Sequence, residues 1–247
     1  PRAFFLNKGT NLQDQQNLHD LSQYKDKLYK ADYISLRLKF MSKLKQLSLA
    51  LKDPKFKVTK QSQHSHLYRE LKGMNEWIDK IADEYLRTQV KEALSKFESR
   101  TLPKLKELPH QLIHNDANDW NIVTTESGPS LIDFGDIIFA PRIIGLAVAA
   151  AYVALESDDP TLSTTHLIRG YHMIAPLTPG ELELLFDCIT IRIASSIANA
   201  ALQLSQNPEN NYLSISQDRT PATLAKLLAT DSNYALYRFR NAAGYDA

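Results

Sequence analysis

The chain has 247 residues, of which 43% are hydrophobic and 23% charged, and its formal net charge is +1. This composition is typical of a soluble globular protein and excludes a low-complexity chain. The single cysteine, Cys188, excludes an intrachain disulfide framework, and its apolar neighbours predict a buried thiol rather than a catalytic one. The longest apolar run, 143–155, is too short to cross a bilayer and indicates a buried helix. We therefore expect a cytoplasmic protein that does not act at a membrane.

The charge is unevenly distributed along the chain. Residues 1–70 contain 14 Lys and Arg against 6 Asp and Glu, whereas residues 71–247 contain 15 against 22. A solvated basic helical face explains this most simply, and a nucleic-acid surface or a surface facing a polyanionic nucleotide are the alternatives. The sequence has no zinc-ligand spacing, no aromatic RNA-binding signature and no clear helix-turn-helix. Nucleic acid is therefore not the expected partner.

Helical periodicity dominates the first part of the sequence. Apolar residues recur at three- and four-residue steps between Asp32 and Leu51, and Pro54 ends that helix. Two further helices are predicted at about 66–84 and 86–102, the second of which stops near a proline.

The pattern changes between residues 109 and 141. A polar segment, 114–119, is followed by the β-branched run Asn121–Thr125, a Gly-Pro turn signal and a second short apolar run, Leu131–Phe134. Two short strands around such a turn predict a β-hairpin, which would hold the polar segment beside Asp133.

Helices are again predicted after the hairpin, at about 143–155, 161–173, 179–204 and 221–229. Thr178 and Glu181 have the spacing of a capping box at the start of the third. The sequence thus predicts a mainly α fold with a small β component.

Two motifs contain the candidate chemistry: His114-x-Asp116-x-x-x-x-Asn121 and, twelve residues after Asn121, Asp133-Phe134-Gly135. Phosphoryl transfer from ATP needs a carboxylate that orients and deprotonates the acceptor hydroxyl. It also needs oxygen ligands that hold Mg²⁺ against the phosphates. One aspartate and one asparagine, presented from a loop and a hairpin, meet the second requirement.

Residues 112–136 resemble the catalytic segment of the aminoglycoside phosphotransferase and choline kinase superfamily, whose members are relatives of the protein kinases. The strings 113–121 and 132–136 are most similar to the hydroxylysine kinase branch. Further similarity lies in Gly170-Tyr171, in Arg192–Ser196 and in Asn207–Leu213. The resemblance covers about residues 75–240. It implies a protein-kinase-like C-terminal lobe, helical with a small β-hairpin that bears the catalytic and metal residues.

The resemblance also assigns roles to the residues of the two motifs. Asp116 is implied to be the catalytic base, and His114 is implied to brace the catalytic loop. Asn121 and Asp133 are the implied Mg²⁺ ligands. Gly135 is expected to allow a tight backbone turn after the metal aspartate.

Other residues near the motifs have weaker assignments. Asp119 and Asp136 are acidic groups that could meet a cationic substrate amine, although a turn or cap role for Asp119 is an equal alternative. Trp120 is predicted to pack in the core. Arg192 and the pair Asn210-Asn211 could contact the substrate, and structural hydrogen bonding is the alternative.

Residues 2–9 resemble the hinge strand that links the two lobes in this superfamily, so Phe4, Phe5 and Leu6 would border the adenine of ATP through backbone contacts. A complete kinase also needs a glycine-rich cover for the phosphates and a strand lysine. The sequence contains neither these nor a Gly-x-x-x-x-Gly-Lys phosphate loop, and on this interpretation it begins where the N-terminal lobe ends.

The predicted division is a hinge-like segment at 1–12, a helical part at 13–108, the catalytic loop and metal-binding hairpin at 109–140, and a helical subdomain at 141–247.

The sequence departs from the family pattern at Gly145, where the family usually has an aspartate that would brace the catalytic loop. Residues 237–244 resemble a junction in longer proteins that continue into further domains.

These observations leave two hypotheses for the function. The first is an ATP- and Mg-dependent phosphotransferase acting on the hydroxyl of a hydroxylysine-, homoserine-, choline- or aminoglycoside-like compound. The alternative is a non-catalytic, kinase-derived binding module within a larger multidomain protein.

Overall fold

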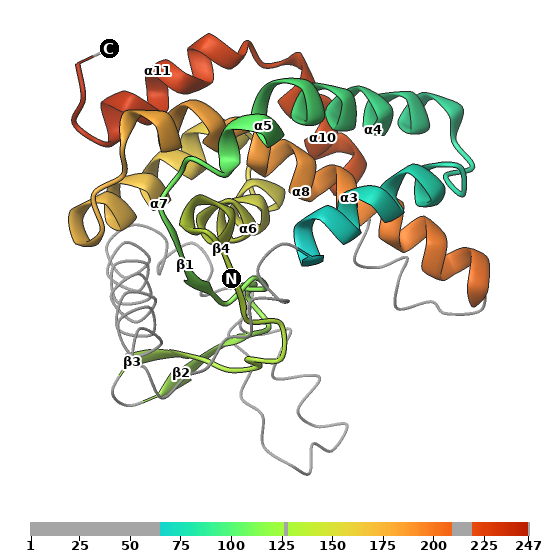
Figure 1. Cartoon of the computed structure of the whole chain (residues 1–247), viewed down its shortest axis with the longest axis horizontal. Coiled ribbons are helices and arrows are strands. Elements are labelled where there is room, and N and C mark those ends of the chain that lie inside the picture. Colours follow the sequence, from blue (N-terminus) through green and yellow to red (C-terminus); the bar gives the residue numbers. More distant parts are fainter. Residues whose placement is uncertain (1–64, 126–127, 209–218, 247) are drawn as a thin grey trace.

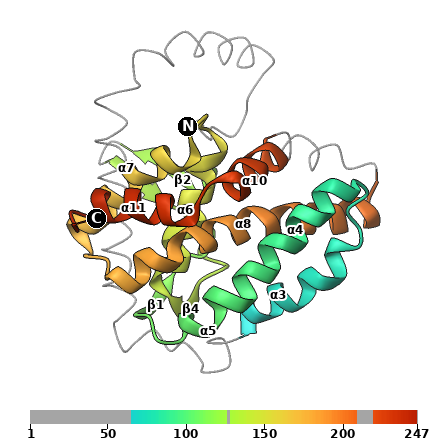
Figure 2. The same cartoon turned by 90° about the horizontal axis from the view of Figure 1, so that it is seen from above.

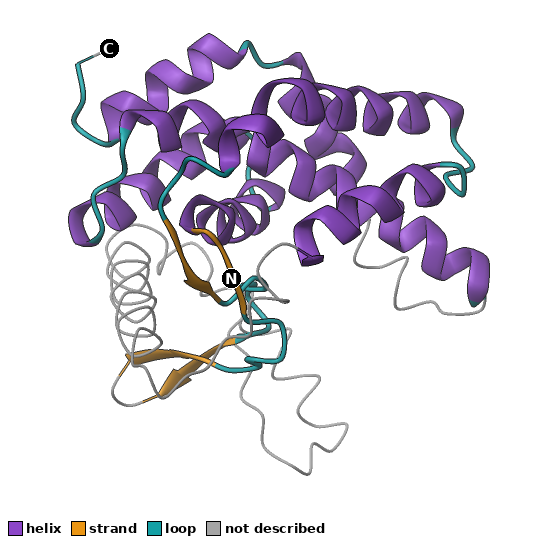
Figure 3. Cartoon of the chain, viewed as in Figure 1, coloured by secondary structure: helices purple, strands orange, loops and turns teal. Residues whose placement is uncertain are grey.

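The computed structural model describes residues 65–125, 128–208 and 219–246 (Figure 1). Helices form the body of this part, and four short strands lie at one side of it (Figure 3). The predicted fold class, mainly helical with a small antiparallel β component, is confirmed. The predicted helix between Asp32 and Leu51 and the hinge-like segment 1–12 lie outside the described residues.

The first described helices only partly follow the prediction. The helix expected to reach residue 84 ends at Ile78, and Pro103 does not end a helix. It lies instead in the first turn of a new one, where the missing N–H of proline costs no hydrogen bond. A π-helical segment with buried Phe97 and Thr101 precedes that turn. The observed elements are α3 (Ser65–Ile78), α4 (Glu84–Lys96), the π-helical Phe97–Thr101 and α5 (Leu102–Leu105).

The later helices are α6 (Arg142–Leu155), α7 (Pro160–Ile174), α8 (Pro179–Gln206), α10 (Thr220–Ala229) and α11 (Ser232–Ala242). The first four agree with the predicted ranges to within two residues, and α11 was not predicted. Asp231 caps α11 by accepting from two backbone N–H groups, and Phe239 on its inner face is fully buried. Much of the segment that resembled a junction therefore belongs to a packed helix.

Helix α8 is the central element of the fold. It contacts α3, α4, α6, α10 and α11, which surround it in Figure 2. The predicted capping box at its start is confirmed, because Thr178 and Glu181 bond reciprocally to each other's backbone N–H. By length and composition alone α8 could cross a membrane, but 67% of its most apolar window is buried inside the fold. That burial is the pattern of a core helix.

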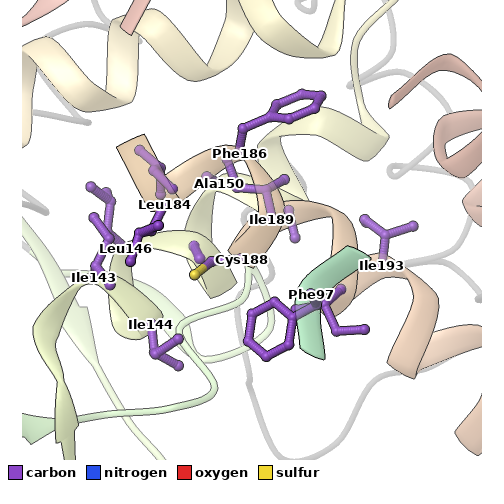
Figure 4. Packing of buried hydrophobic residues seen from close by; sticks show 14 of the residues in the cluster. Phe97, Ile143, Ile144, Leu146, Ala150, Leu184, Phe186, Cys188, Ile189 and Ile193 are labelled. Carbon is purple, nitrogen blue, oxygen red and sulfur yellow. The ribbon is translucent and has the colours of Figure 1, made fainter. Parts of the chain in front are cut away.

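Side chains of α6 and α8 meet in the hydrophobic core (Figure 4). Helix α6 is apolar on nearly every face, as expected of a helix covered on all sides. Cys188 on α8 is 2% exposed, and burial raises the pKa of its thiol well above the ordinary range. The prediction of a buried cysteine is confirmed.

Four strands form two antiparallel pairs: β1 (His110–Ile113) with β4 (Ile138–Pro141), and β2 (Ile122–Thr125) with β3 (Gly128–Leu131). The predicted hairpin is confirmed, but its second strand lies three residues earlier than expected. The backbone of Asp133 has φ of 61°, which an extended strand cannot adopt, so the ladder ends before that residue. The pairing of β1 with β4 was not predicted.

Gly145 has a packing role in the structure. A Cβ atom built at this position of α6 would lie 3.2 Å from both Cβ and Cγ2 of Ile113, closer than most side-chain contacts. The glycine therefore allows α6 to approach β1 closely at the residue before the first loop of the site. An aspartate here would displace β1, the strand that leads into the catalytic loop which such an aspartate was expected to brace.

Candidate active site

Two loops between the strand pairs form the candidate site. One loop, residues 114–121, joins β1 to β2, and the other, residues 132–137, joins β3 to β4. The last residue of β1, Ile113, pairs with the first residue of β4, Ile138, and β2 and β3 pair at the opposite ends of the loops. The antiparallel pairing therefore brings the two sequence motifs side by side.

Hydrogen bonds tie the two loops together. Nε2 of His114 lies 2.9 Å from the carbonyl oxygen of Ile132, and because a carbonyl only accepts, Nε2 is the protonated nitrogen. The N–H of Ile132 donates to the carbonyl of Asn121 at 3.0 Å. These bonds hold Asp133, the next residue, close to Asn121. His114 is 3% exposed and meets the ring of Phe134 edge-on, so its contacts agree with the bracing role predicted for it.

Asp116 is held by the side chains of its own loop. Its Oδ2 accepts hydrogen bonds from Nδ2 of Asn118 and from Nδ2 of Asn121, both at 3.0 Å. Asn121 Nδ2 also donates to the carbonyl of Asp116 at 2.8 Å, and the backbone N–H of Asn121 donates to Oδ1 of Asn118 at 2.9 Å. With Oδ2 occupied by two donors, Oδ1 is the oxygen left to accept a further proton donor.

Asn121 and Asp133 present oxygen atoms of the kind that Mg²⁺ prefers. The amide nitrogen of Asn121 is directed at Asp116, which leaves its Oδ1 as the candidate ligand. Asp133 is exposed, and one of its oxygens lies 3.4 Å from the N–H of Gly135. Within 65–125, 128–208 and 219–246, no three His, Cys, Asp or Glu side chains gather into a metal-binding group. One amide and one carboxylate nevertheless fit a Mg²⁺ ion that keeps several waters and binds phosphate oxygens.

Two residues of the site have left-handed backbone conformations. Asn115 has φ of 65° and Asp133 has φ of 61°, values that Asn and Asp tolerate better than other non-glycine residues. The tight turn predicted at Gly135 is present: Gly135 and Asp136 form a turn in which the N–H of Ile137 faces the carbonyl of Phe134 at 3.4 Å, and Gly135 does not have a left-handed φ. Such conformations immediately before Asp116 and at Asp133 are typical of sites where the surrounding contacts fix the backbone.

A tyrosine and an arginine from the helical body complete the surroundings of Asp116. Arg192 on α8 lies 3.9 Å from Oδ1 of Asp116, donates to the hydroxyl of Tyr152 on α6 at 3.2 Å and stacks over the tyrosine ring. Burial raises the pKa of Tyr152, and the charge of Arg192 opposes that effect. Asp116 and Asp119 raise the pKa further, whereas a hydrogen bond with Asn118 lowers it. Tyr152 thus touches the same loop.

Sequence reasoning missed Tyr152 and named Arg192 only as one of several open possibilities. Tyr152 lies 36 residues after Asp116 in an apolar helix, where nothing in the local pattern distinguishes it from a core residue. The positions of Tyr152 in α6 and Arg192 in α8 could not reveal from the sequence that both side chains point at the same loop.

The remaining predicted residues have mixed outcomes. Asp119 is half-buried beside Asp116, and Asp136 is exposed in the second loop. Trp120 is 54% exposed, so the prediction that it packs in the core is wrong: it lies within the loop 114–121 and faces solvent. Phe4, Phe5 and Leu6, with Asn210 and Asn211, lie outside the described residues.

Comparison with known protein families identifies the family of this chain. Residues 40–183 match the phosphotransferase enzyme family, which is more than half of the chain. The chain therefore belongs to this family.

Individual relatives are similar to parts of the chain. Hydroxylysine kinase from Xenopus laevis is 28% identical over 147 residues, which cover 55% of this chain and 39% of that enzyme. Hydroxylysine kinase from Danio rerio is 24% identical over 196 residues, which cover 76% of this chain and 55% of that enzyme. The chain thus spans about half the length, or less, of the curated relatives that it matches.

Solved structures show the same fold at low sequence identity. Amicoumacin kinase hAmiN, solved in complex with AMP-PNP, Ca²⁺ and Ami, aligns with a TM-score of 0.54 and 15% identity. That alignment covers 81% of this chain and 61% of the other. An ethanolamine kinase from Plasmodium vivax aligns with a TM-score of 0.50 and 16% identity over 80% and 60% of the two chains.

Proposed function

We propose that the protein transfers the γ-phosphoryl group of ATP, with Mg²⁺, to the hydroxyl of a small amine or amino acid. Hydroxylysine is the first candidate acceptor, because relatives that bear its name are similar in sequence to this chain. Membership of the phosphotransferase family and the likeness to a kinase structure with bound AMP-PNP support the use of a nucleotide.

The observation that carries the proposal is the asymmetric environment of the Asp116 carboxylate. Two amide donors occupy Oδ2, whereas Oδ1 accepts no hydrogen bond from the described residues. An oxygen held in place and left without a donor is what a general base needs to receive a hydroxyl proton.

In the proposed mechanism the acceptor hydroxyl donates its hydrogen bond to Oδ1 of Asp116. That contact orients the hydroxyl oxygen toward the γ-phosphorus of ATP. Asp116 takes the proton as the new O–P bond forms and the bond from the γ-phosphorus to the β-phosphate oxygen breaks, so that ADP leaves. The general base is worth roughly 10²–10⁴-fold in rate. His114 positions the second loop through its bond to the carbonyl of Ile132 and touches no reacting atom.

Asn121 and Asp133 would hold the metal ion, which neutralises charge on the phosphates when it is bound. Asp119 and Asp136 are the carboxylates proposed to face a substrate amine. Phe4, Phe5 and Leu6 are proposed to border the adenine through their backbone.

The test is a kinase assay of the full-length protein with ATP, Mg²⁺ and a panel of hydroxylated amines and amino acids. We expect phosphorylation of at least one acceptor, and we expect Asp116→Asn to lower kcat by roughly 10²–10⁴-fold. Asp158→Asn, an exposed aspartate away from the loops, is the matched control and should not change kcat. Tight binding of Mg-ATP without any product would favour the non-catalytic module instead.

A further inference from the structure

Arg192 has hydrogen-bond donors for which the described residues provide no acceptor. A guanidinium has five N–H donors in a fixed planar fork. Among the described residues, Arg192 makes a single hydrogen bond, from Nη2 to the hydroxyl of Tyr152. Its closest approach to Asp116, 3.9 Å, is outside hydrogen-bond distance. The side chain is 29% exposed, so it is not sealed inside the described fold.

The position of Arg192 relative to Asp116 indicates which part of a ligand it would meet. Oδ2 of Asp116 faces Asn118 and Asn121, the second of which is a candidate metal ligand. Oδ1, the oxygen proposed to receive the acceptor hydroxyl, faces Arg192. Arg192 therefore lies on the acceptor side of the carboxylate rather than on the metal side.

Tyr152 holds the guanidinium in this position. Its hydroxyl accepts from Nη2, and its ring lies under the guanidinium carbon at 5.6 Å from the ring centroid. One face of the guanidinium is thus packed and one nitrogen is engaged, whereas the remaining edge stays available. A planar edge of two N–H groups matches a carboxylate, which accepts two parallel hydrogen bonds.

We propose that Arg192 binds the carboxylate of the acceptor, and that the acceptor is therefore a hydroxy amino acid rather than a hydroxylated amine without a carboxylate. This inference rests on the proposed function and adds the residue that selects the substrate class. The site presents both signs of charge, the guanidinium of Arg192 and the carboxylates of Asp119 and Asp136. Such a pair complements a zwitterion, whereas a simple amino alcohol offers no carboxylate to the remaining N–H donors of Arg192.

The experiment compares acceptors that differ only in the carboxylate. Steady-state kinetics of the full-length protein are measured with 5-hydroxylysine and its decarboxylated form, 1,5-diaminopentan-2-ol, and with homoserine and 3-aminopropan-1-ol. For the better amino acid we expect kcat/KM to exceed that of its decarboxylated form by about 10- to 200-fold, the range for hydrogen bonds to a charged group.

Arg192→Gln should remove most of this preference by lowering kcat/KM for the amino acid alone. Arg192→Lys, which keeps the charge but loses the fork, should give an intermediate value. Arg219→Gln removes an exposed arginine whose ion pair with Glu156 lies elsewhere on the surface, and should change neither acceptor.

Two results would overturn the inference. One is equal kcat/KM for an amino acid and its decarboxylated form in the unaltered protein. The other is an equal loss for both compounds in Arg192→Gln, which would assign Arg192 to the orientation of Asp116 or to the phosphate. If no acceptor is phosphorylated, the proposed function fails, and the affinities of the same compounds are measured by calorimetry. Tighter binding of the amino acids than of their decarboxylated forms, lost in Arg192→Gln, would sustain the inference about Arg192. Equal affinities for both forms would contradict the inference as well.

Discussion

The ion pair between Arg142 and Glu181 is the interaction whose loss should cost the fold most. Arg142 begins α6 directly after β4, and Glu181 lies in the first turn of α8. Nε and Nη2 of the arginine donate to the two carboxylate oxygens at 2.6 and 2.7 Å, and Glu181 is fully buried. The hydrogen bond with Glu181 is the main cause of a raised pKa for Arg142. We predict that Glu181→Ala strongly destabilises the protein.

The size of the expected loss in stability follows from the groups that Glu181→Ala leaves without a partner. Arg142 is only 16% exposed, and it would keep one acceptor, the carbonyl of Pro176. Removing one partner of a buried pair costs about 3–5 kcal/mol, because the other charge stays buried without compensation. Glu181 also accepts from the backbone N–H of Thr178, so the capping box, worth about 1 kcal/mol, is lost as well. We expect a total loss of about 4–6 kcal/mol.

Urea unfolding followed by far-ultraviolet circular dichroism measures this loss. Glu183→Ala is the matched control, since Glu183 lies two residues along the same helix and its pair with Lys104 is half exposed on both sides. That control should cost about 0–1 kcal/mol. Glu181→Gln, which keeps an acceptor oxygen but not the charge, should fall between the two. Equal losses for Glu181→Ala and Glu183→Ala would refute the reasoning.

Three further predictions concern packing, thiol reactivity and the loops. Gly145→Ala should have a free energy of unfolding about 1–3 kcal/mol lower than Gly180→Ala when both are unfolded in urea. The methyl group added at residue 145 crowds Ile113, whereas the methyl group added at residue 180 makes only an ordinary contact. Equal stabilities of the two variants would contradict this reasoning. Cys188 should react with a thiol reagent only after unfolding, and a rapid release of one thiol equivalent from the native protein would count against its burial. His114→Ala should lower the free energy of unfolding by about 1–3 kcal/mol, because it leaves a backbone carbonyl unpaired. It should also lower kcat with little change in KM, and an unchanged kcat would contradict its positioning role.

Much of the helical part could be predicted because its signals are local. The capping box of Thr178 and Glu181 and the apolar run that became α6 need only neighbouring residues to be recognised. Helix α11 had comparable signals, the N-cap Asp231 and the apolar spacing of Ala235 and Phe239, and these were not used.

Only some contacts of the candidate site could be predicted from local sequence patterns. The two motifs predicted that Asp116 and Asn121 would meet, and the structure joins them by a hydrogen bond. The contacts of Tyr152 and Arg192 depend instead on how α6 and α8 cross, which no local pattern encodes. The left-handed backbone of Asp133 had no local signal either, because no glycine at that position marks the end of the β2–β3 ladder.

The central claim is that Asp116 and Asp133 have different tasks in phosphoryl transfer. The most direct measurement is the single-turnover rate from γ-labelled ATP to the best acceptor as a function of Mg²⁺ concentration. Asp116→Asn should lower the rate by roughly 10²–10⁴-fold at every Mg²⁺ concentration and leave the half-saturating concentration unchanged. Asp133→Asn should raise that half-saturating concentration. Transfer by Asp116→Asn at the rate of the unaltered protein would contradict the account.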